Sequence, residues 1–168
     1  MQLCVDRGAD FNEDRTRRYR LWRLTGLRGQ VVLFVMLNPS DADETEDDPT
    51  LRRCIGFAER WRCSRIEVVN AFTAVTSAPS ELKRLVTTAD SEDDEYLRRG
   101  LSACDFVVAA WGRNGTYLGR DKQVRGLLRE SGKPVYCFGV TKNGQPEHPL
   151  YIPYARALVP FIGAGSNR

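Results

Sequence analysis

Four short apolar runs, each leading into a polar loop, constrain the fold of this 168-residue chain more than any other feature. They are "VVLFVML" (31–37), "RIEVVN" (65–70), "FVVAAWG" (106–112) and "PVYCFG" (134–139). Such nearly continuous apolar runs are typical of parallel strands that are covered on both faces. Segments with helical patterns separate them. The sequence therefore predicts a three-layer α/β/α fold around a central four-stranded parallel sheet.

The helical segments carry recognisable start signals. Asp48 followed by Pro49 is typical of a helix N-cap with proline at the first helical position. Ser91 has an acidic residue three positions later, a capping pattern that predicts a helix to about Ala103. A further polar helix is expected over residues 118–130, before a glycine and a proline.

An N-terminal strand or hairpin is expected before the first run. Residues 19–24 and 31–37 flank a glycine-containing turn and are predicted to pair with each other. The length of the chain suits one domain over residues 1–168. No apolar stretch approaches the roughly 20 residues needed to cross a bilayer, and the N-terminus lacks the apolar core of a signal peptide. We therefore expect a cytoplasmic protein without membrane contact.

The cysteines give no sign of a metal centre. They are odd in number, scattered, and never paired as CxxC, so the sequence predicts no zinc site, no iron–sulfur cluster and no cofactor. The five are Cys4, Cys54, Cys63, Cys104 and Cys137.

Charge is unevenly distributed along the chain. The net charge is +3, but residues 41–48, "DADETEDD", hold six of the 22 acidic residues. Outside that run, 25 basic residues face the remaining 16 acidic ones. This excess suits a polyanionic partner, although solvated charged faces explain it equally well. The run lacks the spacing of a calcium-binding loop, and we expect Asp47 and Asp48 to cap a helix and bind nearby arginines.

Polar residues gather in the loops that follow the four runs. Ligands of parallel α/β sheets bind outside the carboxyl ends of the strands, so these loops are the candidate site. Asn38 precedes Pro39, which restricts the backbone and so fixes the direction of the Asn38 amide. Asn70 ends the second run. His148, the only histidine, lies between two prolines in the last loop. Each also has a structural interpretation, as a turn residue or as an ordinary hydrogen-bonded histidine. No nucleophile elbow, P-loop or dinucleotide fingerprint is present.

In order along the chain, "LNPSDAD", "VVNAFTAV", "VVAAWG" and "HPLY" resemble the motif series of the uracil-DNA glycosylase superfamily, over about residues 31–151. More closely, "LNPSDADETEDDPTLRRC" and "GQPEHPLY" resemble a prokaryotic and phage family known as domain of unknown function 1643. The name of that second family implies no activity. The glycosylase resemblance implies a similar fold and an enzyme that cleaves N-glycosidic bonds.

The glycosylase resemblance also implies roles for individual residues. His148 matches the histidine that donates toward the departing base, and Asn38 matches the position that orients water. The mismatch-specific branch of the superfamily also has asparagine at this first-motif position. The resemblance therefore implies a modified or damaged base as substrate at least as much as uracil. Asn70 matches the asparagine that reads the base edge. The residues expected to bind substrate are Pro39, Ser40, Asn70, Phe72, Trp111 and Gly112, with Phe72 stacking on the base.

DNA is the partner that the glycosylase resemblance implies. Leu150 and Tyr151 are expected to wedge into the duplex while a base is flipped out. The residues expected near DNA are Arg52, Arg53, Arg113, Lys142, Asn143, Leu150 and Tyr151. Two alternatives stay open: a nucleoside- or nucleotide-processing transferase or hydrolase that does not act on DNA, and a non-catalytic module that binds a modified base. No obligate protein partner is expected.

Overall fold

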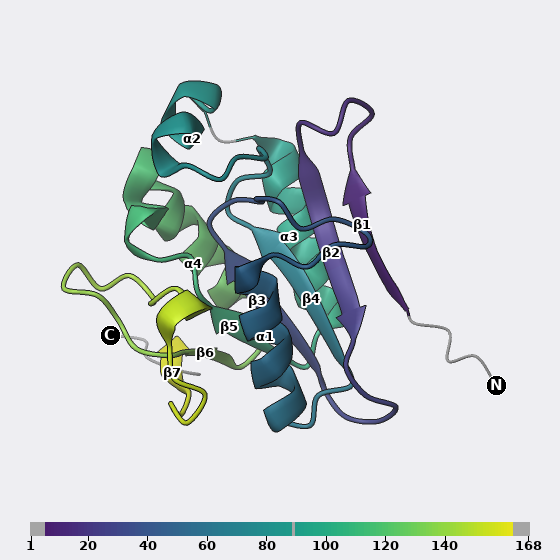
Figure 1. The fold of residues 1–168 in the computed structure, drawn as a ribbon. Coiled ribbons are helices and arrows are strands. Elements are labelled where there is room, and N and C mark those ends of the chain that lie inside the picture. Colours follow the sequence, from purple (N-terminus) through teal and green to yellow (C-terminus); the bar gives the residue numbers. More distant parts are fainter. Residues whose placement is uncertain (1–5, 89, 163–168) are drawn as a thin grey trace.

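The computed structural model describes residues 6–88 and 90–162, which form a mixed α/β fold around one sheet (Figure 1). Seven described strands make up the sheet in the order β1-β2-β4-β3-β5-β6-β7. They are β1 (Arg7–Phe11), β2 (Arg18–Leu24), β3 (Val31–Met36), β4 (Arg65–Asn70), β5 (Phe106–Ala109), β6 (Val135–Cys137) and β7 (Val159–Ile162). The four predicted runs are confirmed as the parallel centre, β4-β3-β5-β6. The sheet is larger than the four parallel strands and the N-terminal strand or hairpin that were predicted, because antiparallel strands extend both edges.

The predicted pairing of residues 19–24 with 31–37 was also wrong. Strand β2 pairs with β1 on one side and with β4 on the other, so β4 lies between β2 and β3. The burial of each strand explains this order. All but the first residue of β3 are buried, which requires neighbours on both sides and cover on both faces. Strand β2 alternates more strongly between buried and partly exposed residues, which suits a place nearer the edge.

Four α-helices connect the strands: α1 (Pro49–Arg60), α2 (Pro79–Leu85), α3 (Ser91–Ala103) and α4 (Arg120–Ser131). Asp48 is confirmed as the N-cap of α1. The cap of α3 is Asp90, not Ser91, and it forms a capping box with Asp93. Helix α4 begins two residues later than predicted because Leu118 and Gly119 adopt left-handed backbone angles (φ 55° and 65°). Helix α2 was not predicted.

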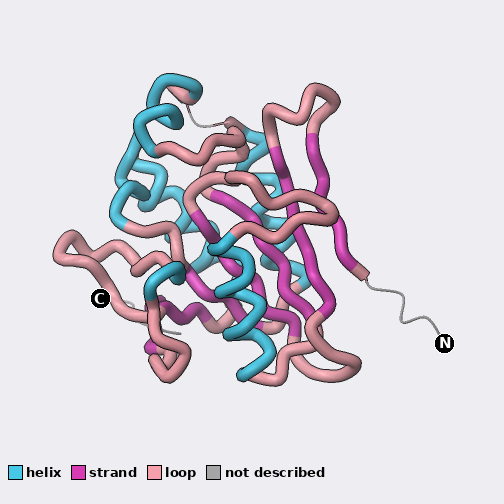
Figure 2. The backbone as a smooth tube through the Cα atoms, in the orientation of Figure 1, coloured by secondary structure: helices cyan, strands magenta, loops and turns pink. Residues whose placement is uncertain are grey.

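Helices cover both faces of the sheet (Figures 1 and 2). Alternate side chains of β3 point to opposite faces, so Val32 and Phe34 join one buried cluster while Leu33 and Val35 join the other. The first cluster includes the buried side of α1, and the second includes those of α3 and α4. No helix among the described residues is long and apolar enough to cross a membrane.

The strand order places a crevice at the carboxyl edge of the sheet. After β3 the chain crosses to β4 on one side, whereas after β5 it continues to β6 on the other. The loops that leave β3 and β5 therefore diverge, and sheets of this kind bind ligands at such a point.

Candidate functional site

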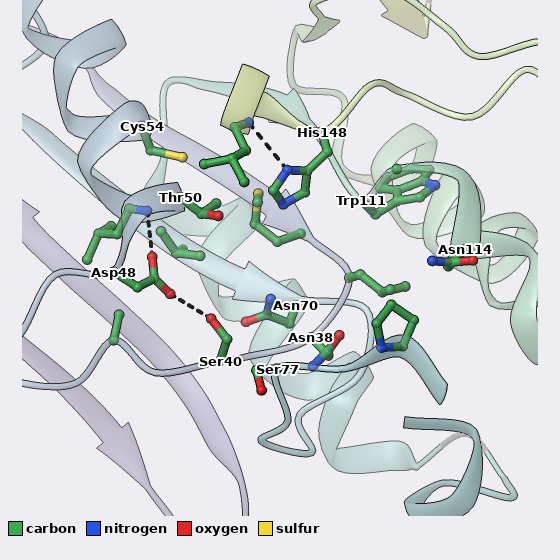
Figure 3. A pocket seen from close by; sticks show the side chains of 18 of the residues that line it. Asn38, Ser40, Asp48, Thr50, Cys54, Asn70, Ser77, Trp111, Asn114 and His148 are labelled. Atoms are coloured by element: carbon green, nitrogen blue, oxygen red, sulfur yellow. Dashed lines mark hydrogen bonds between the residues drawn. The ribbon is translucent and has the colours of Figure 1, made fainter. Parts of the chain in front are cut away.

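A cavity of about 790 Å³ lies at the carboxyl ends of β3, β4 and β5. Its size is within the range of small-molecule sites, about 300–1,000 Å³. Asn38 from the loop after β3, Asn70 from the end of β4, and His148 from the loop that follows β6 all line it (Figure 3). Three residues separated by up to 110 positions in the sequence thus share one cavity.

Asn38 presents a fixed acceptor. Its Nδ2 donates to Pro39 O at 2.9 Å and to Thr76 O at 2.7 Å, which uses both amide hydrogens. The side-chain oxygen is therefore the group that remains for a ligand or water. Pro39 was predicted to contact substrate, but it is buried and is not among the residues that line the cavity.

Asn70 is buried but lacks a partner among the described residues. Only 4% of it is exposed, and its backbone continues the β3–β4 pairing opposite Met36. No hydrogen bond joins its side chain to another described residue, and neither polar atom is sealed from solvent. Buried polar groups are normally hydrogen-bonded, because an unpaired one costs free energy. The carboxamide of Asn70 is thus free to bond a ligand through a donor and an acceptor.

His148 is held as a neutral ring with one defined donor. It caps the short 3₁₀ helix η2 (Pro149–Tyr151), and Leu150 N donates to its Nδ1 at 3.3 Å. A neutral imidazole that accepts at Nδ1 carries its proton on Nε2. The ring reaches solvent through the cavity, but the protein around it disfavours the charged form. This desolvation lowers the pKa of His148, and the negative charge of Asp48 opposes the shift.

Asp48 and Ser40 add a carboxylate and a hydroxyl to the same cavity. Ser40 Oγ donates to Asp48 Oδ2 at 2.6 Å, and Leu51 N donates to Oδ1 at 2.7 Å (Figure 3). The carboxylate is therefore fixed between the start of α1 and the loop after β3. Ser40 was predicted at the site from the sequence, whereas Asp48 was predicted to cap the helix and bind arginines, and not to line the site.

Trp111 and Gly112 form another part of the wall. Trp111 is 2% exposed, and its Nε1 donates to Gln145 Oε1 at 2.9 Å, so its indole N–H is already used. Gly112 has a φ of 74°, and a Cβ at this position would lie 3.6 Å from the Cβ of His148. Its N–H donates to Pro146 O at 2.8 Å, which joins the loop after β5 to the loop that carries His148.

Phe72 does not contribute to the cavity, so its predicted stacking on a base was wrong. It is fully buried in the cluster beneath α3 and α4, and its ring packs against Tyr117 at 5.8 Å between centroids. The cause is local backbone bonding. Ala71 N and Phe72 N donate to the carbonyls of Met36 and Leu37, which directs the Phe72 side chain into the core.

Four of the residues predicted to contact DNA lie outside the cavity lining. Arg53 donates to Ile152 O and lies over the ring of Tyr154, 3.7 Å from its centroid. Arg52 donates to the carbonyl of Asp47. Both arginines therefore have internal contacts. The other two are Lys142 and Asn143, which are exposed in a turn.

The other three predicted DNA contacts do line the cavity: Arg113, Leu150 and Tyr151. Tyr151 is 91% exposed, so a large aromatic ring lies open to solvent at the edge of the cavity. Some lining residues were not predicted, because nothing in the sequence around them distinguishes them from ordinary polar surface residues. These are Arg18, Thr50, Thr76, Ser77, Asn114, Thr141 and Glu147.

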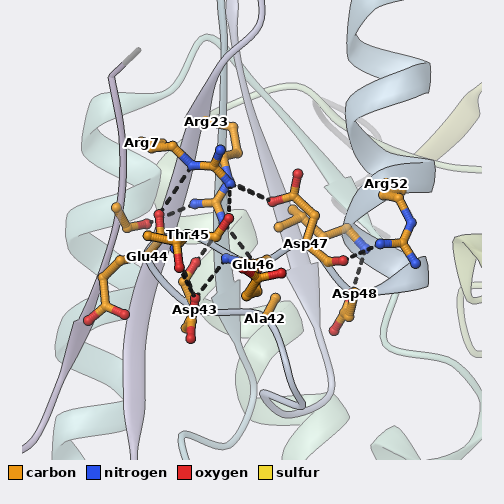
Figure 4. A network of polar contacts seen from close by, with 12 residues as sticks. Arg7, Arg23, Ala42, Asp43, Glu44, Thr45, Glu46, Asp47, Asp48 and Arg52 are labelled. Carbon is orange, nitrogen blue, oxygen red and sulfur yellow. Dashed lines mark hydrogen bonds and ion pairs between the residues drawn. The ribbon is translucent and has the colours of Figure 1, made fainter. Parts of the chain in front are cut away.

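The acidic run at 41–48 is bound by arginines of β1 and β2 (Figure 4) and by an arginine of the turn between these two strands. Arg23 Nε donates to Asp47 Oδ1 at 2.8 Å, Arg7 lies 3.4 Å from the same oxygen, and Arg15 pairs with Glu44 at 2.8 Å. The expectation that Asp47 binds nearby arginines is confirmed. These pairs neutralise basic residues, so counting charges without the run overstated how basic the surface is.

The fold and cavity define an α/β protein with a preformed polar site at the carboxyl edge of parallel strands. Residues 18–150 match the model of the family described as Protein of unknown function (DUF1643), and the chain belongs to that family. Comparison with curated proteins and with solved structures found no match. None of these comparisons supports the resemblance to uracil-DNA glycosylases.

Proposed function

We propose that this protein hydrolyses the N-glycosidic bond of a base that is flipped out of DNA. One observation carries the proposal: the unpartnered carboxamide of Asn70, the free oxygen of Asn38 and the imidazole of His148 line one cavity. A base edge presents adjacent hydrogen-bond donors and acceptors, and the Asn70 carboxamide complements such an edge.

The chemistry follows from the group that each residue presents. As the glycosidic bond breaks, its electron pair leaves with the base, and negative charge grows on a base oxygen. The Nε2–H of His148 donates to that oxygen and stabilises the charge. The oxygen of a water forms the new bond to the sugar carbon, and Asn38 Oδ1 accepts one hydrogen of this water and orients it.

The attacking water must also lose a proton, and an asparagine cannot take it. Asp48 lines the same cavity and carries a carboxylate that is fixed by Ser40 and by Leu51 N. We assign the role of general base to Asp48. Asp48 supplies the carboxylate base that the first motif lacks, because that motif has asparagine at position 38.

We propose that Tyr151 and Leu150 replace the flipped base in the duplex. Both line the cavity, and the Tyr151 ring is almost entirely exposed. Apolar and aromatic side chains that insert between base pairs offset part of the cost of unstacking. In the proposed complex the base enters the cavity while Tyr151 contacts the bases left behind.

The test is incubation with oligonucleotides that carry single altered bases, including hypermodified phage bases, followed by detection of abasic sites. The proposal expects cleavage of at least one such base, and expects His148→Ala to lower the rate far more than the affinity. A substitution that lowers both equally, or absence of abasic sites across the whole panel, contradicts it.

A second candidate is an N-glycosidic hydrolase or transferase that acts on free nucleotides. It is favoured by the contacts of Arg53 with Ile152 O and with the ring of Tyr154, which make this arginine less available to a DNA backbone. The two candidates differ in salt dependence. Affinity for an oligonucleotide that falls steeply with salt supports DNA, whereas turnover of mononucleotides without such dependence supports the second candidate.

A further inference from the structure

Arg18 is a buried cation that lines the cavity. It lies at the start of β2 and is only 5% exposed. Its backbone N–H donates to Thr73 O at 3.0 Å, and its Nη1 donates to Ala42 O at 2.8 Å. Backbone and side chain are therefore both anchored. Leu21 and Ala42, two buried apolar residues, line the same cavity.

The guanidinium of Arg18 is not fully satisfied. Its Nε is buried and has no hydrogen-bond partner among the described residues. No described carboxylate lies within 4.0 Å to form an ion pair with it, in contrast to Arg23, which binds Asp47. Burial lowers the pKa of Arg18 to about 10, and the charge of Asp48 opposes this shift. The group therefore stays charged near neutral pH.

A buried charge without an ion pair is unfavourable, and proteins normally supply a partner for it. The two carboxylates that line the cavity, Asp48 and Glu147, form no ion pair with Arg18 and are held in place by other partners. Asp48 accepts from Ser40 and from Leu51 N, and Glu147 pairs with Arg156 at 3.2 Å. Nη2 of Arg18 also has no hydrogen-bond partner among the described residues and, unlike Nε, is not sealed from the surface, so it is the nitrogen that a ligand in the cavity can reach.

We propose that the wall formed by Arg18 is an anion subsite, in which the guanidinium binds an oxygen of a phosphate or carboxylate on the ligand. A planar guanidinium suits such groups because it donates two parallel hydrogen bonds. The inference concerns binding alone and goes beyond the proposed cleavage step. If the ligand is DNA, the anion is a backbone phosphate; if it is a free nucleotide, the anion is its own phosphate.

The direct test is ¹⁵N NMR of the Arg18 side chain during titration with sodium phosphate and with sodium acetate. Sodium chloride at equal ionic strength is the control. The subsite predicts that the Nε–H resonance shifts saturably with phosphate or acetate and stays in place with chloride. Identical responses to all three salts overturn the proposal, because they show screening and no site.

Thermal unfolding of variants gives an independent measurement. Arg18→Met removes the charge, whereas Arg28→Met removes an exposed arginine from the turn before β3, at the opposite end of the sheet. Phosphate at constant ionic strength is expected to raise the Tm of the unsubstituted protein and of Arg28→Met, but not of Arg18→Met. An equal rise in Arg18→Met contradicts the subsite. If Arg18→Met does not fold, the NMR titration decides alone.

A last pair of probes identifies the source of the anion. The unsubstituted protein is expected to bind deoxyuridine 5′-monophosphate at least tenfold more tightly than deoxyuridine if the subsite takes the phosphate of a free nucleotide. Equal affinity for the two, together with a positive phosphate titration, assigns the subsite to a backbone phosphate or a ligand carboxylate. None of these measurements requires cleavage, so failure of the proposed hydrolysis leaves them interpretable.

Discussion

The backbone N–H of Leu150 donates to Nδ1 of His148 over 3.3 Å, and this bond determines which nitrogen of the ring faces the cavity as a donor. Protonation of the ring would place a hydrogen on Nδ1 and break the bond. The cap of η2 and the proposed donor therefore depend on the same neutral state of His148.

The first prediction concerns the pH dependence of activity. Because desolvation lowers the pKa of His148, the neutral donor persists below the ordinary value of about 6.5. We expect kcat/KM to be constant above that value and to fall only at lower pH, as the ring gains its second proton. His148→Gln keeps an N–H donor and should remove this acidic limb. A limb that remains in His148→Gln belongs to another group.

The same shift predicts how stability depends on pH. A histidine whose pKa is lower in the folded state favours folding when neutral. Its contribution is complete above the unfolded pKa and is lost as the pH falls through the folded one. Urea unfolding of the unsubstituted protein should thus show a loss of stability below about pH 6.5 that is smaller in His148→Gln. Equal losses in both proteins would exclude His148 as the cause.

The second prediction separates the two roles of Asp48. Asparagine caps helices as well as aspartate does, so Asp48→Asn should keep the start of α1 and change the free energy of unfolding by less than about 0.5 kcal/mol. It removes the general base, which should lower kcat by about 10²–10⁴-fold. Asp41→Asn, an exposed residue of the same loop, is the matched control and should leave kcat unchanged.

The third prediction tests Asn70 as the residue that reads the base. Its side chain has no hydrogen-bond partner in the part of the chain that the structure describes, so Asn70→Ala should leave the free energy of unfolding nearly unchanged. Asn70→Ala removes two hydrogen bonds to the ligand and leaves the ligand's polar groups unpaired, which costs about 1–3 kcal/mol. This loss should lower kcat/KM by about 10–100-fold. Asn143→Ala, in an exposed turn, is the control. A large loss of stability in Asn70→Ala would show that the carboxamide has a structural role.

The fourth prediction contrasts two neighbouring arginines of α1. Arg53 contacts Ile152 O and the ring of Tyr154, whereas Arg52 is exposed. Arg53→Ala should lower the free energy of unfolding by about 1–3 kcal/mol, and Arg52→Ala by less than about 0.5 kcal/mol. Chemical denaturation measures both. If Arg53→Ala instead weakens DNA binding with no loss of stability, Arg53 is a surface contact after all.

The centre of the sheet could be predicted from the sequence because each parallel strand is an unbroken apolar run. The edge strands could not. Strand β1 reads "RGADF" and β7 reads "VPFI", and neither has the length or alternation that distinguishes a strand from a loop. The order of β2, β4 and β3 also depends on long-range pairing, whereas the predicted hairpin assumed that neighbours in sequence pair with each other.

The site was predictable to the extent that strand ends determine it. Asn38, Asn70, Trp111 and His148 follow directly from the rule that ligands bind at the carboxyl edge. Phe72 could not be placed from sequence, because the direction of a side chain in a loop depends on local backbone bonds. Arg18 gave no signal, since nothing in "TRRYR" shows which arginine is buried and which pairs with an acidic residue.

The two hydrogen bonds that Asn38 donates to Pro39 O and Thr76 O also have a consequence for inhibitor design. They prevent the carboxamide from rotating, so its oxygen cannot be exchanged for its nitrogen. A competitive compound should therefore carry an N–H or O–H opposite Asn38 and a carbonyl opposite Nε2 of His148. A compound with this polarity reversed would place an acceptor against the oxygen of Asn38 and a donor against Nε2–H of His148, and neither pair can form a hydrogen bond.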